Sequence, residues 1–243
     1  LAVHPGAPEP LEAANTFLDN HRRLVAILRG RYFRPSRIAR RARRETYRAD
    51  ENGRLSPFDR IFRRVGKAHG IDWRLLAAVA YAESRFDPKA ESRFGAKGLM
   101  QLLPSTAKRV GVTDLLDPRK NVLAGARYLE RLMKIFADDG VDPRQQIRFA
   151  LAAYNCGLGH VMDARDIARK IGKDPDRWFN EVEDAMRLKQ NPKWHRRTRY
   201  GYARARETIA YVSSIQSQYD VFARHVPLEP PSRAKQDGSE AKN

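Results

Sequence analysis

The chain has very little cysteine and no long hydrophobic run. Its single cysteine, Cys156, cannot form an internal disulfide and cannot by itself hold a structural zinc ion. The longest apolar run, Leu75 to Ala82, has eight residues, whereas a helix that spans a bilayer needs roughly 20. The six histidines are scattered and none has H-E-x-x-H spacing, so the sequence predicts no metal site.

Acidic residues are nearly missing from two windows of a strongly basic chain. The formal net charge of the 243 residues is +18. Residues 21–48 hold eleven arginines and one acid, and residues 187–206 hold eight Lys or Arg and no acid. These two windows account for the whole excess, so the remainder is balanced. Such windows indicate a polyanionic partner: a nucleic acid, an anionic lipid surface or an acidic polymer.

Helix start and stop signals recur at regular intervals from Ser56 onward. Asp72, Asp117 and Asp142 are expected N-caps, the last two each followed by a proline, and Gly70 is an expected helix stop. Few windows alternate as strands do, so the body over residues 56–226 is predicted to be all-α. The expected helices of the body cover residues 56–69, 72–84, 104–110, 121–137, 145–155, 160–170, 176–186 and 204–222.

Glu83 stands at the end of the most apolar of these helices. The apolar spacing of Trp73, Leu76 and Val79 predicts that this helix is buried almost all round. A buried carboxyl group at the negative end of a helix should have a raised pKa. A protonated carboxyl group near neutral pH is what a general acid for glycoside cleavage requires. In the alternative interpretation, Glu83 extends to solvent or pairs with Arg85.

Three further runs of residues follow Glu83 in a definite order. Together they form the motifs E-S, G-L-M-Q-L-x-P-x-T-A, N-x-x-x-G-x-x-Y-L and A-x-x-A-Y-N-x-G, which begin at Glu83, Gly98, Asn121 and Ala150. In this order and spacing, they resemble the lytic transglycosylase family. The resemblance implies an all-α, lysozyme-like (goose-type) catalytic domain without a cofactor.

The C-terminal part resembles the F-type membrane-bound murein transglycosylases. The residues that carry this resemblance are Asp163, Ala164 and Arg165, and the run from Tyr200 to Val212. F-type members usually have a solute-binding-like domain in front, for which the first 55 residues are too few. The resemblance therefore suggests that the basic, helical N-terminal extension 1–55 is a remnant of that domain. We expect the catalytic domain at 56–226 and a disordered tail at 227–243.

The resemblance also implies the reaction and the residues that carry it. The substrate would be the peptidoglycan glycan strand, cut between N-acetylmuramic acid (MurNAc) and N-acetylglucosamine (GlcNAc) with formation of a 1,6-anhydro ring. Glu83 would act first as the acid and then as the base. The substrate-binding residues carried over by motif are Ser84, Met100, Gln101, Tyr154, Asn155 and Tyr211.

Each of these binding residues also has an interpretation without function. Ser84 can simply close the end of its helix, and Met100 can belong to the core. Asn155 can be a left-handed helix cap before Gly157, and Tyr211 a core tyrosine. Asp87, the nearest candidate for a second carboxylate, precedes a proline and is predicted to be a turn residue.

Three other functions compete with the lytic transglycosylase. A muramidase on the same fold would need a second acid to activate water, and a non-catalytic peptidoglycan-binding module would keep the groove without turnover. A nucleic-acid partner is not expected, because no nucleic-acid-binding motif accompanies the arginines. The basic windows are predicted to hold the protein against an anionic membrane or cell-wall surface. The expected location is the periplasm, at the outer membrane.

Overall fold

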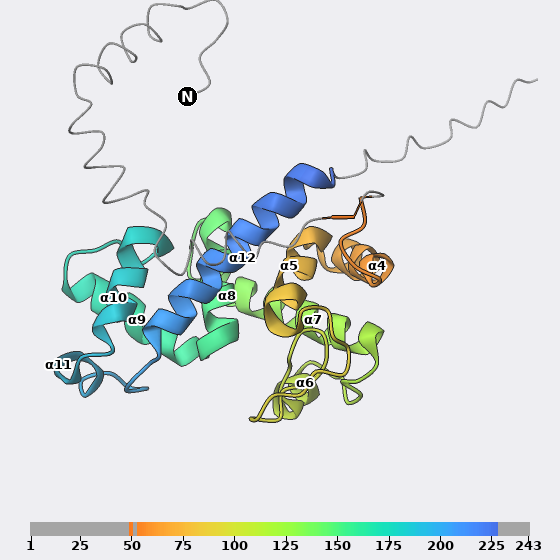
Figure 1. Cartoon of the computed structure of the whole chain (residues 1–243). Coiled ribbons are helices and arrows are strands. Elements are labelled where there is room, and N and C mark those ends of the chain that lie inside the picture. The colour runs from red at the N-terminus through yellow and green to blue at the C-terminus, as the bar shows by residue number, and fades with distance from the viewer. Residues whose placement is uncertain (1–48, 51–52, 228–243) are drawn as a thin grey trace, which may run out of the picture. The chain divides into compact units, whose positions relative to one another are not determined.

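The computed structural model describes residues 49–50 and 53–227 as a helical body (Figure 1). Two isolated bridges, Glu91–Lys97 and Lys97–Leu102, are the only β-type pairings there, which confirms the all-α prediction for the described residues. The helices are α4 (Asp59–His69), α5 (Trp73–Ser84), α6 (Pro104–Arg109), α7 (Pro118–Asp138), α8 (Pro143–Cys156), α9 (Leu158–Lys170), the π-helical turn η2 (Trp178–Val182), α10 (Glu183–Leu188), α11 (Pro192–His195) and α12 (Ala205–His225).

The predicted N-caps are confirmed at three helices. Asp72, Asp117 and Asp142 each accept a hydrogen bond from the backbone N–H two residues later, at 2.8 to 2.9 Å. Each bond satisfies an amide that the first helical turn leaves without a partner. Gly70 ends α4 in the left-handed conformation with φ 63°, as predicted. Short polar side chains therefore fix where the long helices begin.

Two predicted helices differ from the structure. The first helix begins at Asp59 rather than Ser56, because the Asp59 carboxylate accepts hydrogen bonds from Leu55 N and Ser56 Oγ and keeps those residues outside the helix. The prediction of one helix over 176–186 is wrong. Phe179 and Asn180, inside η2, have a non-helical backbone (Asn180 φ 64°), so the regular helix forms only after Asn180 and continues as α10.

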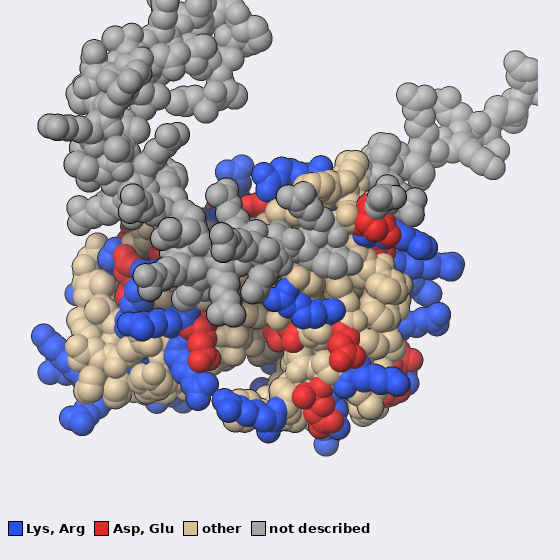
Figure 2. Space-filling view, viewed as in Figure 1, with Lys and Arg blue, Asp and Glu red and all other residues tan. Residues whose placement is uncertain are grey.

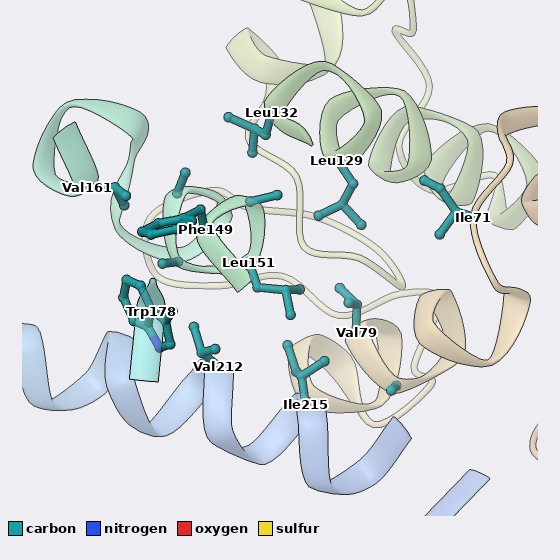
Figure 3. Close-up of a cluster of buried hydrophobic side chains, with 14 of the residues drawn as sticks. Ile71, Val79, Leu129, Leu132, Phe149, Leu151, Val161, Trp178, Val212 and Ile215 are labelled. Carbon is teal, nitrogen blue, oxygen red and sulfur yellow. The ribbon is translucent and has the colours of Figure 1, made fainter. Parts of the chain in front are cut away.

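The core lies where α5, α7, α8 and α12 meet. Val79 from α5, Leu129 from α7, Leu151 from α8 and Val212 from α12 point toward one another there (Figure 3). All four are at most 2% exposed, and burying each contributes roughly 1.5–3 kcal/mol. None of the described helices is both long and apolar enough to cross a lipid bilayer.

A smaller apolar cluster lies under α6. Leu102, Ala107, Val112 and Leu115 are buried against Ala124 of α7. The long connection from α5 to α7 is thereby attached to the main body. This connection carries the G-L-M-Q run, so the cluster determines where that run lies.

The predicted domain boundaries are not tested. Most of the basic extension 1–55 and nearly all of the tail 227–243 lie outside the described residues. Leu55 is fully buried and belongs to the core. The division at residue 55 therefore stays a prediction.

Candidate active site

Glu83 lies in the last turn of α5, where the apolar helix meets the connection to α6. Arg85 follows as the C-cap in the left-handed conformation (φ 55°), and its guanidinium lies over the Tyr81 ring. Burial of the Glu83 carboxyl raises its pKa from 4.5 to about 7. The direction of this shift agrees with the prediction, so both the protonated and the ionised carboxyl are accessible near neutral pH.

Tyr211 reaches Glu83 from α12, which packs along α5. The Tyr211 hydroxyl donates a hydrogen bond of 2.6 Å to Glu83 Oε1. This bond stabilises the carboxylate and so lowers the pKa of Glu83, but burial has the larger effect. Burial and the nearby Glu83 raise the pKa of Tyr211 well above 10, so the phenol stays a donor. The structure therefore brings together two residues that are 128 positions apart.

Tyr154, near the end of α8, lies close enough to Glu83 to be affected by its charge. Its hydroxyl donates to the Met100 carbonyl at 2.7 Å, and its ring lies 5.3 Å from that of Tyr128. Burial and the charges of Glu83 and Tyr128 raise the pKa of Tyr154 well above 10. Tyr154 thus links the G-L-M-Q run to the environment of Glu83.

Ser84 ties that run to α5. Its hydroxyl lies 2.8 Å from the Leu99 carbonyl and 3.1 Å from the Ala80 carbonyl, and donates to both. The hydroxyl proton is therefore hydrogen-bonded within the protein, which supports the interpretation that Ser84 closes the end of its helix. Ser84 fixes the run beside Glu83.

Gln101 and Met100 occupy different environments. Gln101 has a left-handed backbone (φ 45°), and its amide donates to the carbonyls of Ala90 and Gly98. Its Oε1 atom is left to accept from a ligand. The Met100 side chain is fully buried, and a Cβ on Gly125 would lie 2.3 Å from its sulfur. That placement favours the core interpretation of Met100 and explains the glycine at position 125.

Asn121 is the residue that sequence reasoning passed over. It is fully buried at the start of α7, where its Oδ1 accepts from Met100 N and its Nδ2 donates to the carbonyls of Lys97 and Leu115, all at 2.8 Å. The signal was its place in N-x-x-x-G-x-x-Y-L, one turn before Gly125, which puts both residues on one helix face. Asn121 therefore fixes the backbone of Met100, whose carbonyl accepts the hydrogen bond from the Tyr154 hydroxyl.

Replacing Asn121 should loosen the run without changing any group near Glu83. In Asn121→Leu, the buried Met100 amide and the Leu115 carbonyl lose their partner, each at a cost of about 1–3 kcal/mol, whereas the Lys97 carbonyl still accepts from Leu102 N. We expect the free energy of unfolding in urea to fall by at least about 2 kcal/mol and the Met100 amide to exchange faster with solvent. Arg127→Gln, at an exposed α7 residue with one bond to Val110 O, is the control. Equal effects of the two variants would contradict this role.

Asn155 is exposed within the last turn of α8. Its Oδ1 accepts from Thr208 Oγ1 at 2.9 Å, so the amide is oriented by the first turn of α12. The left-handed residue at this helix end is Gly157 (φ 93°), not Asn155, so the cap interpretation is wrong. A contact from Asn155 to a sugar amide stays a prediction.

Glu83 has no carboxylate partner within the described part. Only burial and Tyr211 shift its pKa. Asp87 accepts from Lys89 N and donates its own N–H to the Ser84 carbonyl, which confirms that it is a turn residue. Among the described residues, no three His, Cys, Asp or Glu side chains are grouped as a metal site would need.

The second basic window is fixed to α9 by one buried ion pair. Lys189 is fully buried, and its ammonium donates to Asp163 Oδ2 at 2.5 Å. The same carboxylate accepts from the backbone N–H groups of Arg199 and Tyr200. Tyr200 and Tyr202 remain about half exposed.

The chain is similar to known proteins over most of the described part. Residues 60–176 match the family described as the Transglycosylase SLT domain. A membrane-bound lytic murein transglycosylase F from Desulfosudis oleivorans is 45% identical over 70% of this chain and 37% of its own length. The protein of the same name from Stutzerimonas stutzeri is 38% identical over 87% of this chain and 44% of its own. The chain thus spans less than half the length of these relatives.

Two solved structures are similar in fold. The 70 kDa soluble lytic transglycosylase from Escherichia coli superimposes with a TM-score of 0.51 at 24% identity, over 69% of this chain and 24% of that one. An inactive mutant of the lytic transglycosylase Slt from Pseudomonas aeruginosa gives the same values. The lysozyme-like helical fold expected from the motifs agrees with these likenesses.

Proposed function

Because the chain belongs to the lytic transglycosylase family, we propose that it cleaves the bond between MurNAc and GlcNAc in peptidoglycan without consuming water. The observation that carries this proposal is the Glu83 carboxyl, raised in pKa to about 7 and hydrogen-bonded to Tyr211, with no second carboxylate affecting it. Such a group can give up and take back a proton near neutral pH.

Glu83 works in two steps. Protonated Glu83 first donates its proton to the glycosidic oxygen, and the bond from C1 of MurNAc to that oxygen breaks. The resulting Glu83 carboxylate then takes the proton of the MurNAc C6 hydroxyl, whose oxygen bonds to C1. The products are a GlcNAc hydroxyl end and a 1,6-anhydro-MurNAc end, and Glu83 is protonated again.

One carboxyl group suffices because the substrate supplies the nucleophile. Glycosidases that use water or a covalent intermediate place a second carboxylate at about 5–9.5 Å from the first. Here the attacking hydroxyl belongs to the ring that carries the reacting carbon, which gives the advantage of an intramolecular reaction. Acid–base help from Glu83 is worth about 10²- to 10⁴-fold in rate.

The surrounding residues hold the acid and the sugars. Tyr211 keeps the Glu83 carboxyl oriented, and we propose that its phenol oxygen also stabilises positive charge at C1. Gln101 offers its Oε1 atom as an acceptor to sugar hydroxyls and acetamido N–H groups, and Asn155 offers its amide N–H groups as donors. Ser84 and Met100 contribute through the backbone that they fix.

The substrate and the names of the relatives suggest the place of action. Peptidoglycan lies in the periplasm of a double-membraned bacterium, and the curated relatives are named membrane-bound. We therefore place the protein in the periplasm, at the outer membrane. The arginine-rich windows would hold it against an anionic membrane or cell-wall surface.

Digestion of purified sacculi in ¹⁸O-labelled water tests the reaction. We expect muropeptides one water lighter than lysozyme products and without ¹⁸O at the new MurNAc end, measured by mass spectrometry. Hen lysozyme in the same labelled water is the control and should introduce one ¹⁸O per cut. Labelled, reducing ends would instead identify a muramidase, and the absence of products would favour a binding module.

A further inference from the structure

A cavity of about 510 Å³ lies between α4 and the start of α7, apart from the candidate active site. It is within the usual size range of small-ligand sites. Among the described residues, no hydrogen bond or ion pair joins a lining residue of this cavity to Glu83. Its walls are formed by residues from these two helices alone: Arg60, Ile61, Arg64, Val65, Ala68, Arg119, Lys120 and Leu123.

The walls hold four cationic residues and no acid. Arg60 and Arg64 are one turn apart on α4, where like charges repel each other and destabilise the helix. Within the described part of the chain, no carboxylate forms an ion pair with Arg60, Arg64 or Arg119, whereas Lys120 pairs with Asp114 at 3.2 Å. Figure 2 shows Lys and Arg side chains gathered along the edge of the molecule where α4 lies. The cavity is thus suited to an anionic occupant.

The rest of the wall is apolar. Ile61, Val65 and Leu123 are only partly covered, and Ala68 is exposed. A free inorganic anion has no apolar surface to bury, so an apolar wall would not strengthen its binding. An occupant that carries its charge beside hydrocarbon would contact both kinds of wall.

We propose that this cavity binds the head group and adjoining hydrocarbon of an anionic phospholipid. The guanidinium groups of Arg60, Arg64 and Arg119 contact the phosphate, and the apolar wall covers the glycerol backbone and the first methylenes. The eleven arginines of residues 21–48 end ten residues before α4, so the sequence places a second cationic segment close by along the chain. An anionic membrane surface can bind both the cavity and this arginine-rich segment.

The lipid site is independent of the reaction at Glu83. Phe62, on the buried face of α4, packs toward Phe86 with ring centroids 6.2 Å apart. The cavity lines the other face of that helix, so a lipid there touches no residue of the candidate active site. Failure of the lipid site and failure of the proposed reaction are therefore separate results.

Calorimetric titration of the chain with soluble dihexanoyl-phosphatidylglycerol, below its micellar concentration, tests the proposal. We expect saturable binding of one lipid per chain, and at least about tenfold weaker binding in Arg60→Gln/Arg64→Gln, since each arginine near a lipid phosphate contributes about 1 kcal/mol. Ala68→Trp should weaken binding similarly by filling the cavity without changing charge.

Three controls separate this site from general attraction. Arg131→Gln/Arg224→Gln removes the same charge from exposed positions of α7 and α12, outside both basic windows and outside the cavity, and should change affinity less than twofold. Dihexanoyl-phosphatidylcholine and glycerol phosphate should each bind at least about tenfold more weakly than the anionic lipid. Equal loss in Arg131→Gln/Arg224→Gln, full binding in Ala68→Trp, equal binding of glycerol phosphate, or no binding of the anionic lipid would each overturn the proposal.

Discussion

Glu83→Gln should lower the rate of sacculus digestion by about 10³-fold while leaving the fold intact. The glutamine amide has nearly the shape of the carboxyl, and its oxygen can still accept the Tyr211 hydrogen bond. It cannot donate an acidic proton or act as the base, so the full acid–base contribution of about 10²- to 10⁴-fold is lost. The measurement is the initial rate of release of soluble muropeptides.

Asp87→Asn is the matched control for the loss of a carboxylate. Asp87 lies four residues after Glu83 and serves the turn, where asparagine can also accept from Lys89 N. We expect this variant to keep activity within about threefold of the unchanged chain. If it were as inactive as Glu83→Gln, the reaction would require a second carboxylate and the single-carboxyl mechanism would be wrong.

Glu83→Gln should also reveal how much the burial of the ionised Glu83 carboxylate lowers the stability of the folded protein. The carboxyl binds its proton up to about pH 7 when folded but only up to its ordinary value of 4.5 when unfolded. The unchanged chain therefore loses stability relative to Glu83→Gln as pH rises from 4.5 to 7, by at most about 3 kcal/mol. Thermal unfolding should show Glu83→Gln higher in Tm at pH 8, with the difference shrinking at pH 4.5.

Tyr211→Phe should reduce kcat by about ten- to a hundredfold, the cost of a hydrogen bond to a charged group. It should also move the pH profile. Because the Tyr211 hydrogen bond lowers the pKa of Glu83, its removal raises that pKa further. The carboxylate needed for the second step then forms only at higher pH, so the profile shifts to the alkaline side.

Tyr219→Phe provides the control from the same helix. Tyr219 also donates to a carboxylate, Asp72 Oδ2 at 2.9 Å, but two helical turns beyond Tyr211. We expect this variant to change stability and to leave the pH profile of kcat in place. An unshifted profile in Tyr211→Phe, or the same shift in both variants, would contradict the role of Tyr211 in setting the acidity of Glu83.

The helices were predictable where their signals are local. Asp72, Asp117 and Asp142 cap the backbone within three residues of themselves, so the sequence alone locates the start of each helix. The break at Asn180 has no such signal. There Trp178 is buried against Phe149, with ring centroids 5.8 Å apart, and this packing between distant residues overrides helical propensity.

The chemistry of the candidate site was predictable from the sequence, but the contacts between its residues were not. Glu83 follows from an acid at the end of an apolar helix. Tyr211 could be paired with it only through the family resemblance, since 128 residues separate them. Asn121 was missed, because a buried asparagine shows its value only when the three backbone groups it satisfies are known. Motif position alone could not tell that Met100 would be covered by α7.

The position of Tyr211 on α12, the last of the described helices, sets the order in which the residues around Glu83 appear during synthesis. The segment matched to the family ends at residue 176, yet the hydroxyl that Glu83 contacts arrives 35 residues later. At about 5–20 residues per second, α5 and α8 emerge seconds before α12. A nascent chain therefore carries Glu83 without the hydroxyl that orients its carboxyl until α12 has been made.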